Sequence, residues 1–338
     1  MNLPTGLVAC LVLASTVAIT PLVRRYAIAR GLVDCPGPRR NHLGAVPRGG
    51  GLAIAATFAA GVLAAAPGTV VAWMLGSALL VAALGWAEDH RALPVSARLV
   101  AEFGLAAVVV AALGPVDAIA LGGVRVDAAW LWTPLAVVAV VWLTNLFNFM
   151  DGADGLAAAQ AAISAATFAV LFALAGHPGP AEYGLMAAAA ALGFLAWNRP
   201  RARIFLGDTG SLLLGWCMAM LALAGTLTGA AAPALAFIVV APFVVDATLT
   251  LGWRAARGAR WYTPHQDHAY QYLIRAGWSH GRVLLLWIAL NALLVMPAAA
   301  LVVHWPEAEL GVAATLAAVL TGGWYVVHFI VAKERVTP

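Results

Sequence analysis

Charged residues are scarce in this sequence. Asp, Glu, Lys and Arg together make up 10% of the 338 residues, whereas hydrophobic residues make up 63% and the mean hydropathy is +0.90. Soluble domains carry about 25% charged residues, so this composition excludes an ordinary soluble fold. The sequence therefore predicts an all-α, polytopic integral membrane protein, built as a bundle of membrane-crossing helices.

Cysteine is also scarce. The three cysteines, at positions 10, 35 and 217, share no metal-ligand spacing, and Cys10 and Cys217 lie within hydrophobic runs. We therefore expect neither a disulfide nor a structural metal. Long polar connections and clear internal repeats are missing too, so no soluble domain can be separated from the rest. We expect one transmembrane domain over residues 1–338.

The main feature of the sequence is a series of long apolar runs. A membrane-crossing helix needs about 20 mainly apolar residues, and eleven runs approach this length. The seventh run is short and rich in alanine, so a count of ten is also open. The first run has no basic segment before it, and we expect a retained helix rather than a cleaved signal. The runs are residues 3–23, 49–66, 69–86, 97–113, 131–149, 155–175, 184–197, 211–228, 234–253, 283–303 and 311–331.

Basic residues fall almost entirely on one side of this arrangement. Of the nineteen, only Arg125 lies in an even-numbered connection between the runs; the others lie in odd-numbered connections, the adjoining run ends or the C-terminal tail. Lys and Arg accumulate in short cytoplasmic loops, so we expect an extracytoplasmic N-terminus and a cytoplasmic C-terminus in the inner (plasma) membrane. The net charge of +4 then reflects membrane orientation, and no nucleic-acid partner is expected.

Many acidic residues gather at the same cytoplasmic side. Carboxylates at membrane depth are costly and tend to line a shared polar cavity, so this convergence indicates one functional site. The acidic residues concerned are Glu88, Asp89, Asp151, Asp154, Asp208, Asp246 and Asp267.

Two segments carry the strongest local signals. In NLFNFMDGADGLAAA, residues 145–159, Asp151 and Asp154 lie three apart at the start of a helix, framed by glycines. Helix capping explains one of these acids but not both together with Asn148. In WNRPRARIFLGDTGSLLLG, residues 197–215, Asp208 opens a helix just after three arginines, a place suited to a hard divalent cation and phosphates, although a simple helix cap would also fit.

Two further polar segments lie on the same side. GWAEDHRALP, residues 85–94, carries adjacent Glu88 and Asp89. TPHQDHAYQYLIRAGWSH, residues 263–280, places His265 and His268 three apart without a third soft ligand. Imidazoles facing a diphosphate fit the surrounding carboxylates better than a transition-metal site, although an interfacial histidine bonded to backbone is the simpler alternative for either one.

Taken together, these segments resemble those of the polyprenyl-phosphate N-acetylhexosamine-1-phosphate transferases, the superfamily that includes phospho-N-acetylmuramoyl-pentapeptide transferase. The resemblance covers nearly the whole chain in order. It begins at DCPGPRRNHLGAVPRGGG, residues 34–51, and continues through EDH, NFMDGADGLA, IFLGDTGSLLLG and the histidine segment.

The resemblance implies a reaction of EC 2.7.8 type. A polyprenyl phosphate, such as undecaprenyl phosphate, attacks the β-phosphorus of a UDP-N-acetylhexosamine, which gives polyprenyl-diphosphate-sugar and UMP. It also implies Mg²⁺ as the cofactor, with Mn²⁺ as a substitute. Membrane lipids surround the chain, and a homodimer is left open.

The resemblance further implies roles for individual residues. Asp208 would be the principal Mg²⁺ ligand, with Asn148 beside it and Asp151 nearby as a catalytic residue. Asp154 and Phe205 would recognise uracil, and Asn198 would lie near the substrate. The basic group Arg39, Arg40 and His42, with Arg48, would contact phosphates, although Arg48 would also fit as a simple orientation charge. His265 would contact phosphates too, and His268 would be catalytic.

The chain departs from the family pattern at Glu88. The family's acidic pair is usually Asp-Asp, whereas this chain has Glu88 and Asp89, both expected to be catalytic. A phosphate that is already ionised at pH 7 hardly needs a strong base, so positioning and electrostatics are expected to supply most of the catalysis.

The histidine segment separates two branches of the family. HQDHAYQYLIRAGWS resembles the O-antigen-initiating branch, with UDP-N-acetylfucosamine, UDP-N-acetylquinovosamine or UDP-N-acetylglucosamine as donor. Phospho-N-acetylmuramoyl-pentapeptide transferases instead carry three consecutive histidines here. Peptidoglycan synthesis stays as an alternative function, as do a proton-coupled transporter and an inactive lipid-binding scaffold.

Overall fold

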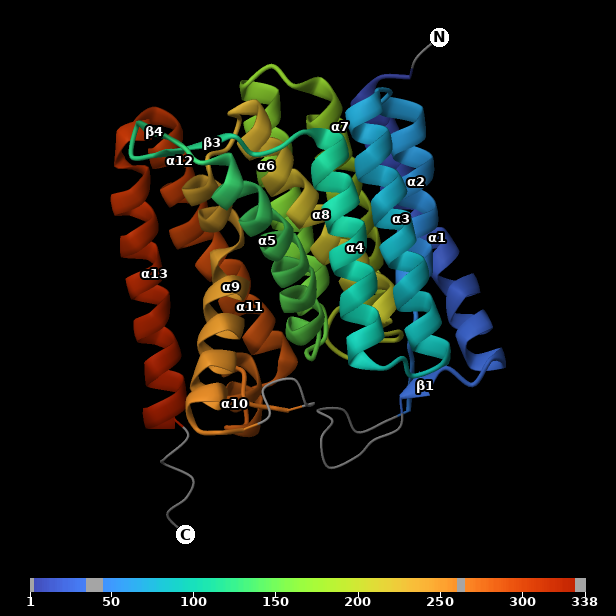
Figure 1. Cartoon of the computed structure of the whole chain (residues 1–338). Coiled ribbons are helices and arrows are strands. Elements are labelled where there is room, and N and C mark those ends of the chain that lie inside the picture. The colour runs from blue at the N-terminus through green and yellow to red at the C-terminus, as the bar shows by residue number, and fades with distance from the viewer. Residues whose placement is uncertain (1–2, 35–44, 260–264, 332–338) are drawn as a thin grey trace.

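The computed structural model describes residues 3–34, 45–259 and 265–331. Over these residues the chain forms a bundle of long, roughly aligned helices (Figure 1). The predicted all-α membrane fold is confirmed, and each of the eleven apolar runs coincides with a helix or a pair of continuous helices. The helices concerned are α1 (Thr5–Ala29), α2 (Gly51–Ala65), α3 (Thr69–His90), α4 (Val95–Leu113), α5 (Ala129–Met150), α6 (Leu156–Leu174), α7 (Pro178–Asn198), α8 (Gly207–Thr228), α9 (Pro233–Ala256), α11 (His280–Leu290) with α12 (Met296–His304), and α13 (Glu309–Val326).

Nine spans within the described residues are long and apolar enough to cross a membrane. The remaining two are α2, which is only 15 residues long, and α7, which begins with prolines and carries Glu182 just after its first turn. Helices α11 and α12 form one continuous span through a π-helical turn, η1 (Asn291–Val295). Asn291 in this turn exchanges two hydrogen bonds with Gln160 of α6, which satisfies both buried amides inside the bundle.

Helix α8 lies at the centre of the bundle, where α2, α3, α5, α6, α7 and α9 surround it. Almost every side chain from Thr209 to Gly225 is buried. Small residues permit this packing, because a Cβ at Gly215 would lie 2.8 Å from the Cα of Thr144 on α5. Close approach at small residues is the usual way in which membrane helices associate.

Short elements close the two ends of the bundle. At the end where α1 begins lies the hairpin of β3 (Ala118–Leu121) and β4 (Val124–Asp127). The backbone N–H of Gly122 in its turn donates to Glu309, the first residue of α13, which directly follows the short helix η2 (Pro306–Ala308). At the opposite end lie the pair β1 (Val33–Asp34) and β2 (Val46–Pro47), and α10 (Ala269–Arg275). The described chain starts at the first end and finishes, in η3 (Val327–Val331), at the second (Figure 1).

Candidate active site

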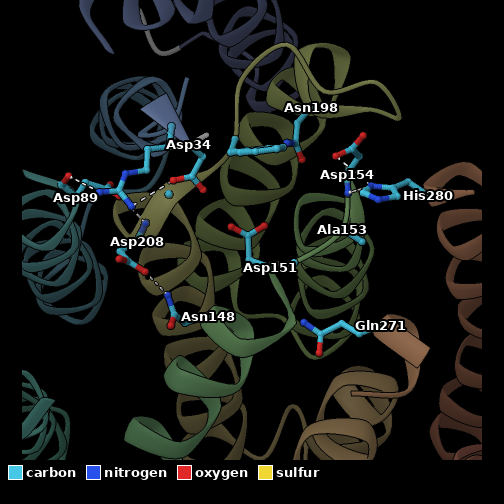
Figure 2. Close-up of a pocket in the computed structure, with 14 residues that line it drawn as sticks. Asp34, Asp89, Asn148, Asp151, Ala153, Asp154, Asn198, Asp208, Gln271 and His280 are labelled. Atoms are coloured by element: carbon cyan, nitrogen blue, oxygen red, sulfur yellow. Dashed lines mark hydrogen bonds and ion pairs between the residues drawn. The ribbon is translucent and has the colours of Figure 1, made fainter. Parts of the chain in front are cut away.

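A polar cavity of about 250 Å³ opens at the end of the bundle that carries β1 and α10. It lies between the ends of α3, α5, α7, α8, α10 and α11, and each of the five segments singled out in the sequence contributes at least one lining residue. Figure 2 shows these side chains converging from separate helices. The lining residues are Asp34, Arg48, Asp89, Asn148, Asp151, Gly152, Ala153, Asp154, Asn198, Phe205, Gly207, Asp208, Gln271 and His280.

Asp89 holds the first turn of α8 in place. Its carboxylate accepts hydrogen bonds from the backbone N–H groups of Asp208 (3.1 Å) and Thr209 (3.0 Å) and from the Thr209 hydroxyl (2.6 Å). The side chain is only 2% exposed. An acid from α3 thus satisfies the free amides at the start of α8, where a negative charge is also favourable to the helix dipole. Asp89 therefore positions Asp208.

Glycines bring the neighbouring helices close to this turn. A Cβ on Gly85 of α3 would lie 2.3 Å from the carbonyl oxygen of Asp208, and one on Gly51 of α2 would lie 2.3 Å from the Cα of Gly210. Gly207 itself has φ of +73°, a left-handed conformation that glycine adopts without strain. The backbone around Asp208 is therefore in close contact with α3 on one side and α2 on the other.

Asn148 orients the Asp208 side chain. Its amide nitrogen donates to Asp208 Oδ1 at 2.5 Å and to Ser211 Oγ at 2.9 Å. Asn148 belongs to the last two turns of α5, so the expected proximity of Asn148 and Asp208 is present in the structure. Asn148 lies near the C-terminal end of α5 and Asp208 near the N-terminal end of α8, and both helix ends border the cavity.

Asp151 stands between two groups of side chains (Figure 2): Asn148 with Asp208 on one side, and Asp154 with His280 on the other. Burial raises the pKa of the Asp151 carboxyl well above its usual range, and the negative charges of Asp208, Asp89, Asp154 and Asp34 raise it further. A cavity that crowds carboxylates in this way has an electrostatic preference for a bound cation.

Asp154 fixes the connection between α7 and α8. Its Oδ2 accepts hydrogen bonds from the backbone N–H groups of Arg201 (3.0 Å) and Ala202 (3.1 Å), and its Oδ1 lies 3.1 Å from His280 Nδ1. Burial alone would raise the pKa of Asp154, but the hydrogen bond and charge of His280 and the two amides outweigh it, so the pKa is lowered. Asp154 is therefore a carboxylate at neutral pH.

Asn198 and Phe205 lie at the two ends of the same connection. The Asn198 side chain accepts from Gly155 N–H (3.0 Å) and donates to the Ile204 carbonyl (3.0 Å), which joins the start of α6 to the segment before α8. Phe205 lines the cavity and is held by backbone hydrogen bonds with Pro47 (2.8 Å) and Gly50 (2.9 Å). An aromatic face in this place can stack on a planar ring.

Glu88 points away from the cavity. It faces Arg98 of α4 at 3.5 Å, and Arg98 also lies 3.7 Å from the fully buried Glu102. Asn145 of α5 donates to Glu102 at 2.5 Å. Glu88 is thus part of a buried polar group that joins α3, α4 and α5, whereas its neighbour Asp89 faces α8. The structure does not bring Glu88 together with the cavity residues.

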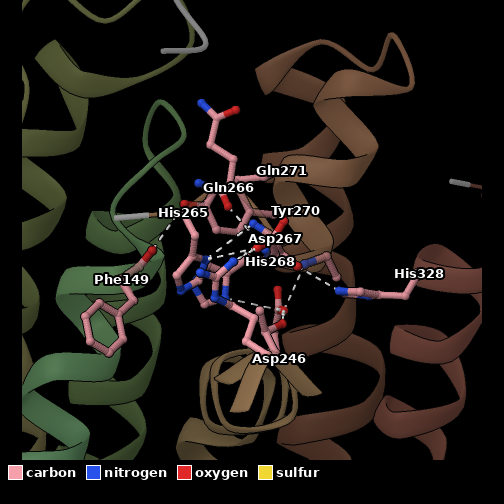
Figure 3. Close-up of polar contacts among 12 residues, drawn as sticks. Phe149, Asp246, His265, Gln266, Asp267, His268, Tyr270, Gln271 and His328 are labelled. Carbon is pink, nitrogen blue, oxygen red and sulfur yellow. Dashed lines mark hydrogen bonds and ion pairs between the residues drawn. The ribbon is translucent and has the colours of Figure 1, made fainter. Parts of the chain in front are cut away.

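His265 and His268 also lie outside the cavity lining. Figure 3 shows them beside Phe149 at the end of α5, with Asp246 of α9 below them. His268 Nδ1 is 3.8 Å from Asp246 Oδ1, which accepts from Ala269 N–H (2.9 Å), and the two histidine rings are 4.8 Å apart. Burial lowers the pKa of His265 to about 4, and the positive charges of His268 and Arg254 act in the same direction.

The histidine segment nevertheless contacts the cavity wall. The Tyr270 hydroxyl donates to the Phe149 carbonyl at 3.2 Å, and a Cβ on Gly152 would lie 2.1 Å from that hydroxyl. Gln271, on the same short helix α10, lines the cavity. The segment thus supports the turn that carries Asp151. Gln271 and His280 were not predicted as lining residues. The local sequence around a glutamine or histidine in a long polar connection does not indicate which part of the fold its side chain contacts.

The predicted basic contacts lie at the edge of the described chain. Arg39, Arg40 and His42 fall outside the described residues. Arg48, which follows them, lines the cavity, donates to the Asp89 carbonyl at 3.0 Å and lies 3.6 Å from Asp34. It brings a positive charge to a cavity wall that otherwise carries mainly carboxylates.

The donor set fits a hard divalent cation that is shared with a substrate. Asp208 and Asp151 are carboxylates on one cavity, and Mg²⁺ typically binds one or two carboxylates together with substrate phosphates and water. No group of three or more His, Cys, Asp or Glu side chains suited to a metal occurs in the part of the chain that the structure describes. A Mg²⁺ ion that is shared with substrate phosphates does not require three protein ligands of this kind.

Comparison with known proteins agrees with this chemistry. Residues 71–226 match glycosyl transferase family 4. A Bacillus subtilis protein named as a probable undecaprenyl-phosphate N-acetylglucosaminyl 1-phosphate transferase is 33% identical over 79% of this chain and 76% of its own. A Mycobacterium tuberculosis decaprenyl-phosphate N-acetylglucosaminephosphotransferase is 30% identical over 85% and 80%. A Synechococcus phospho-N-acetylmuramoyl-pentapeptide-transferase is 32% identical over 82% and 85%.

Proposed function

The chain belongs to glycosyl transferase family 4, as a membrane enzyme of the polyprenyl-phosphate N-acetylhexosamine-1-phosphate transferase type, and we propose that it acts on a UDP-N-acetylhexosamine and undecaprenyl phosphate. Its products are then undecaprenyl-diphosphate-sugar and UMP. The observation that supports this most directly is the single cavity in which Asp151, Asp154 and Asp208 converge at one end of a helical bundle. The transporter and inactive-scaffold alternatives lose their main support, because the relatives are named as transferases.

We assign metal binding to one side of the cavity and uracil binding to the other. On one side Asp208 and Asp151 would hold Mg²⁺, with Asn148 orienting Asp208 and Asp89 fixing the start of α8. The ion would neutralise charge on the diphosphate of the donor. On the other side Phe205 would stack on uracil, and Asp154 would shape the uracil site by holding the connection between α7 and α8.

The protein's own residues supply mainly positioning and charge. Arg48 can contact a phosphate oxygen from the cavity wall, and the acceptor phosphate arrives ionised at neutral pH, so no strong base is needed. We treat residues 1–338 as a single domain, in which a lipid would reach this cavity from the bilayer. We place the cavity on the cytoplasmic side of the inner membrane, because the basic residues gather at that end.

The donor sugar is the finer part of the proposal. Relatives named for N-acetylglucosamine and for N-acetylmuramoyl-pentapeptide are about equally similar to this chain, so overall similarity does not choose between them. The HQDHAYQ segment lacks three consecutive histidines. We therefore propose an N-acetylhexosamine donor without a peptide, with UDP-N-acetylglucosamine first and UDP-N-acetylfucosamine or UDP-N-acetylquinovosamine, for O-antigen initiation, next.

Turnover by the purified protein tests the proposal. The protein in lipid nanodiscs is supplied with undecaprenyl phosphate, Mg²⁺ and each UDP-sugar in turn, and released UMP is measured together with the lipid-linked product. We expect UMP release that requires both the polyprenyl phosphate and the metal. Release only from UDP-N-acetylmuramoyl-pentapeptide would move the protein to peptidoglycan synthesis, and no release from any donor by a folded protein would overturn the proposed function.

A further inference from the structure

A second polar recess lies beside the active-site cavity, at the end of α7. It has a volume of about 450 Å³ and is lined by Ala196, Trp197, Arg199, Pro200, Arg201 and Arg203. We call it the arginine crevice. The sequence suggested that these three arginines serve the phosphates near Asp208, yet none of them lines the active-site cavity. Their place in the structure therefore needs a separate explanation.

The crevice concentrates positive charge without acidic partners. Arg199, Arg201 and Arg203 are exposed, and none forms an ion pair with an acidic residue of the part that the structure describes. Arg24 of α1 adds a fourth guanidinium, because its Nε donates to the Arg203 carbonyl at 3.0 Å. The nearest acid along this connection, Asp154, already accepts from two backbone amides and His280. An anion would relieve the repulsion among these arginines.

One residue of the crevice, Arg201, has an unusual backbone conformation. Arg201 has φ of +67°, and it is the one residue other than glycine with a positive φ among those described. A bulky side chain in this region of φ and ψ costs free energy and is found where surrounding contacts enforce it, often at functional positions. Here the enforcing contacts are the hydrogen bonds from Arg201 and Ala202 to Asp154.

An apolar strip leads from the crevice into the bilayer region. Trp197 is anchored by a hydrogen bond from its Nε1 to the Val17 carbonyl of α1, and the Arg203 guanidinium lies over its ring at 5.4 Å. Ala196 and Leu192 are exposed one turn apart on the same face of α7. A guanidinium cluster at the membrane surface, with exposed apolar side chains above it, matches a molecule that has an anionic head and hydrocarbon chains.

We propose that the arginine crevice binds the phosphodiester head group of an anionic phospholipid, with the acyl chains along Leu192 and Ala196. The inference does not depend on the proposed reaction, because it concerns a recess outside the active-site cavity. Orientation charge alone would explain basic residues at this end, but it requires neither a recess nor the enforced conformation of Arg201. The shared chemistry, a phosphate anion, could also come from a soluble phosphate, and the experiment separates these sources.

Native mass spectrometry of the full chain tests the proposal. The protein is released from nanodiscs that contain phosphatidylglycerol and phosphatidylcholine with identical acyl chains, and the retained lipids are counted. We expect the wild type to retain phosphatidylglycerol preferentially. Arg199→Gln and Arg203→Gln should each weaken that preference about five-fold, which corresponds to about 1 kcal/mol for an arginine near a membrane surface.

Arg257→Gln is the matched control. Arg257 is exposed at the end of α9 and lies over the Trp253 ring at 4.1 Å, so it repeats the arginine–tryptophan pair outside the crevice. The control should keep the wild-type preference, and the melting temperature of each variant checks that it is folded. If Arg199→Gln, Arg203→Gln and Arg257→Gln all showed the same preference for phosphatidylglycerol, the proposal would be overturned. Displacement of the lipid by millimolar inorganic phosphate or UMP would overturn the lipid assignment and identify a soluble phosphate as the occupant.

Discussion

The carboxylates around the active-site cavity differ in what their oxygens already bind. Asp89 and Asp154 each accept hydrogen bonds from two backbone amides, so much of their acceptor capacity serves the protein. Asp208 has one oxygen bound by Asn148, and Asp151 stands in the middle of the cavity (Figure 2). The second pair is therefore the one suited to a cation and a substrate.

This difference predicts a kinetic separation between Asp208 and Asp154. Asp208→Asn should lower kcat by roughly 10²–10³-fold, the loss typical of one electrostatic stabiliser, and excess Mg²⁺ should not restore it. Asp154→Asn should mainly raise KM for the UDP-sugar, by roughly 10- to 150-fold, and relax the preference for uridine. Steady-state kinetics over Mg²⁺ and donor concentrations measure both. An Asp154→Asn enzyme with unchanged KM and lost kcat would place both acids on the metal side.

Glu88 is predicted to contribute through structure. Because it faces Arg98 and not the cavity, Glu88→Asp should retain activity, and Glu88→Ala should lose no more than about 10²-fold. Glu88→Ala should instead lower the melting temperature, because Arg98 loses one partner of a buried polar group. Activity and melting curves of both variants make the measurement. A loss beyond about 10⁴-fold with intact metal binding would assign Glu88 a role in proton transfer.

His265 is predicted to make stability depend on pH. Its pKa is about 4 in the fold, against about 6.5 in an unfolded chain, so between these values the unfolded state binds more protons. The free energy of unfolding should therefore fall as the pH decreases from 6.5 towards 4. Thermal melting of the detergent-purified protein measures the slope. His265→Gln should flatten it, whereas His304→Gln, at an exposed position in the other end of the bundle, should leave it unchanged.

Sequence reasoning located these acids at one end but could not assign their partners. Glu88 and Asp89 are neighbours on a helix, where successive side chains diverge by about 100°, so at most one of them can face α8. The sequence does not say which. Likewise, Asp89 accepts from amides 119 and 120 residues away, and no local pattern records such a pairing.

At the level of helices, the start of α8 is the element on which the site depends. It is capped by Asp89 of α3, approached by Gly51 of α2 and tied to α5 through Asn148 and Ser211. The helix spans were predictable because apolar length and turn residues are local properties. The central position of α8 was not, because it results from small residues that match between helices far apart in the sequence.

This packing predicts different outcomes for two glycines of α3. Gly85→Ala would place a methyl group 2.3 Å from the Asp208 carbonyl, which should cost about 1–3 kcal/mol of stability and displace Asp208. A displacement of about 1 Å can lower activity about 10²-fold. Gly76→Ala, on the same helix with no atom within 4 Å of the added Cβ, should be neutral or slightly stabilising. Melting temperature and UMP release compare the two. Equal effects would show that α8 tolerates movement at this point.

At the scale of the whole bundle, the described part of the chain begins and ends on opposite faces, as an odd number of crossings requires. Apart from Arg125 in the β3–β4 hairpin, the basic residues that the structure describes lie on the same face as the active-site cavity, and the hairpin lies on the other face (Figure 1). This agreement was predictable, because charge asymmetry is a property of the whole sequence that needs no tertiary contacts.

Cysteine labelling tests the orientation. In a variant without the three native cysteines, Val124→Cys on the hairpin, where the native side chain is 63% exposed, should react with an impermeant maleimide added to intact cells. Ala256→Cys, exposed at the end of α9, should react only after the cells are opened. Labelling of Ala256→Cys in intact cells would place the active-site cavity outside and overturn the proposed use of a cytoplasmic nucleotide sugar.

The placement of the cavity at one end of the bundle also determines in which leaflet the proposed product is made. A diphosphate-sugar head group carries charges that are too costly to move through hydrocarbon without assistance. The lipid-linked sugar therefore leaves the enzyme with its head group on the face where the nucleotide entered. Any assembly of the sugar into material beyond the membrane then depends on a separate protein that turns the lipid over, and that protein's rate, together with the return of free polyprenyl phosphate, would limit how often this cavity can be refilled.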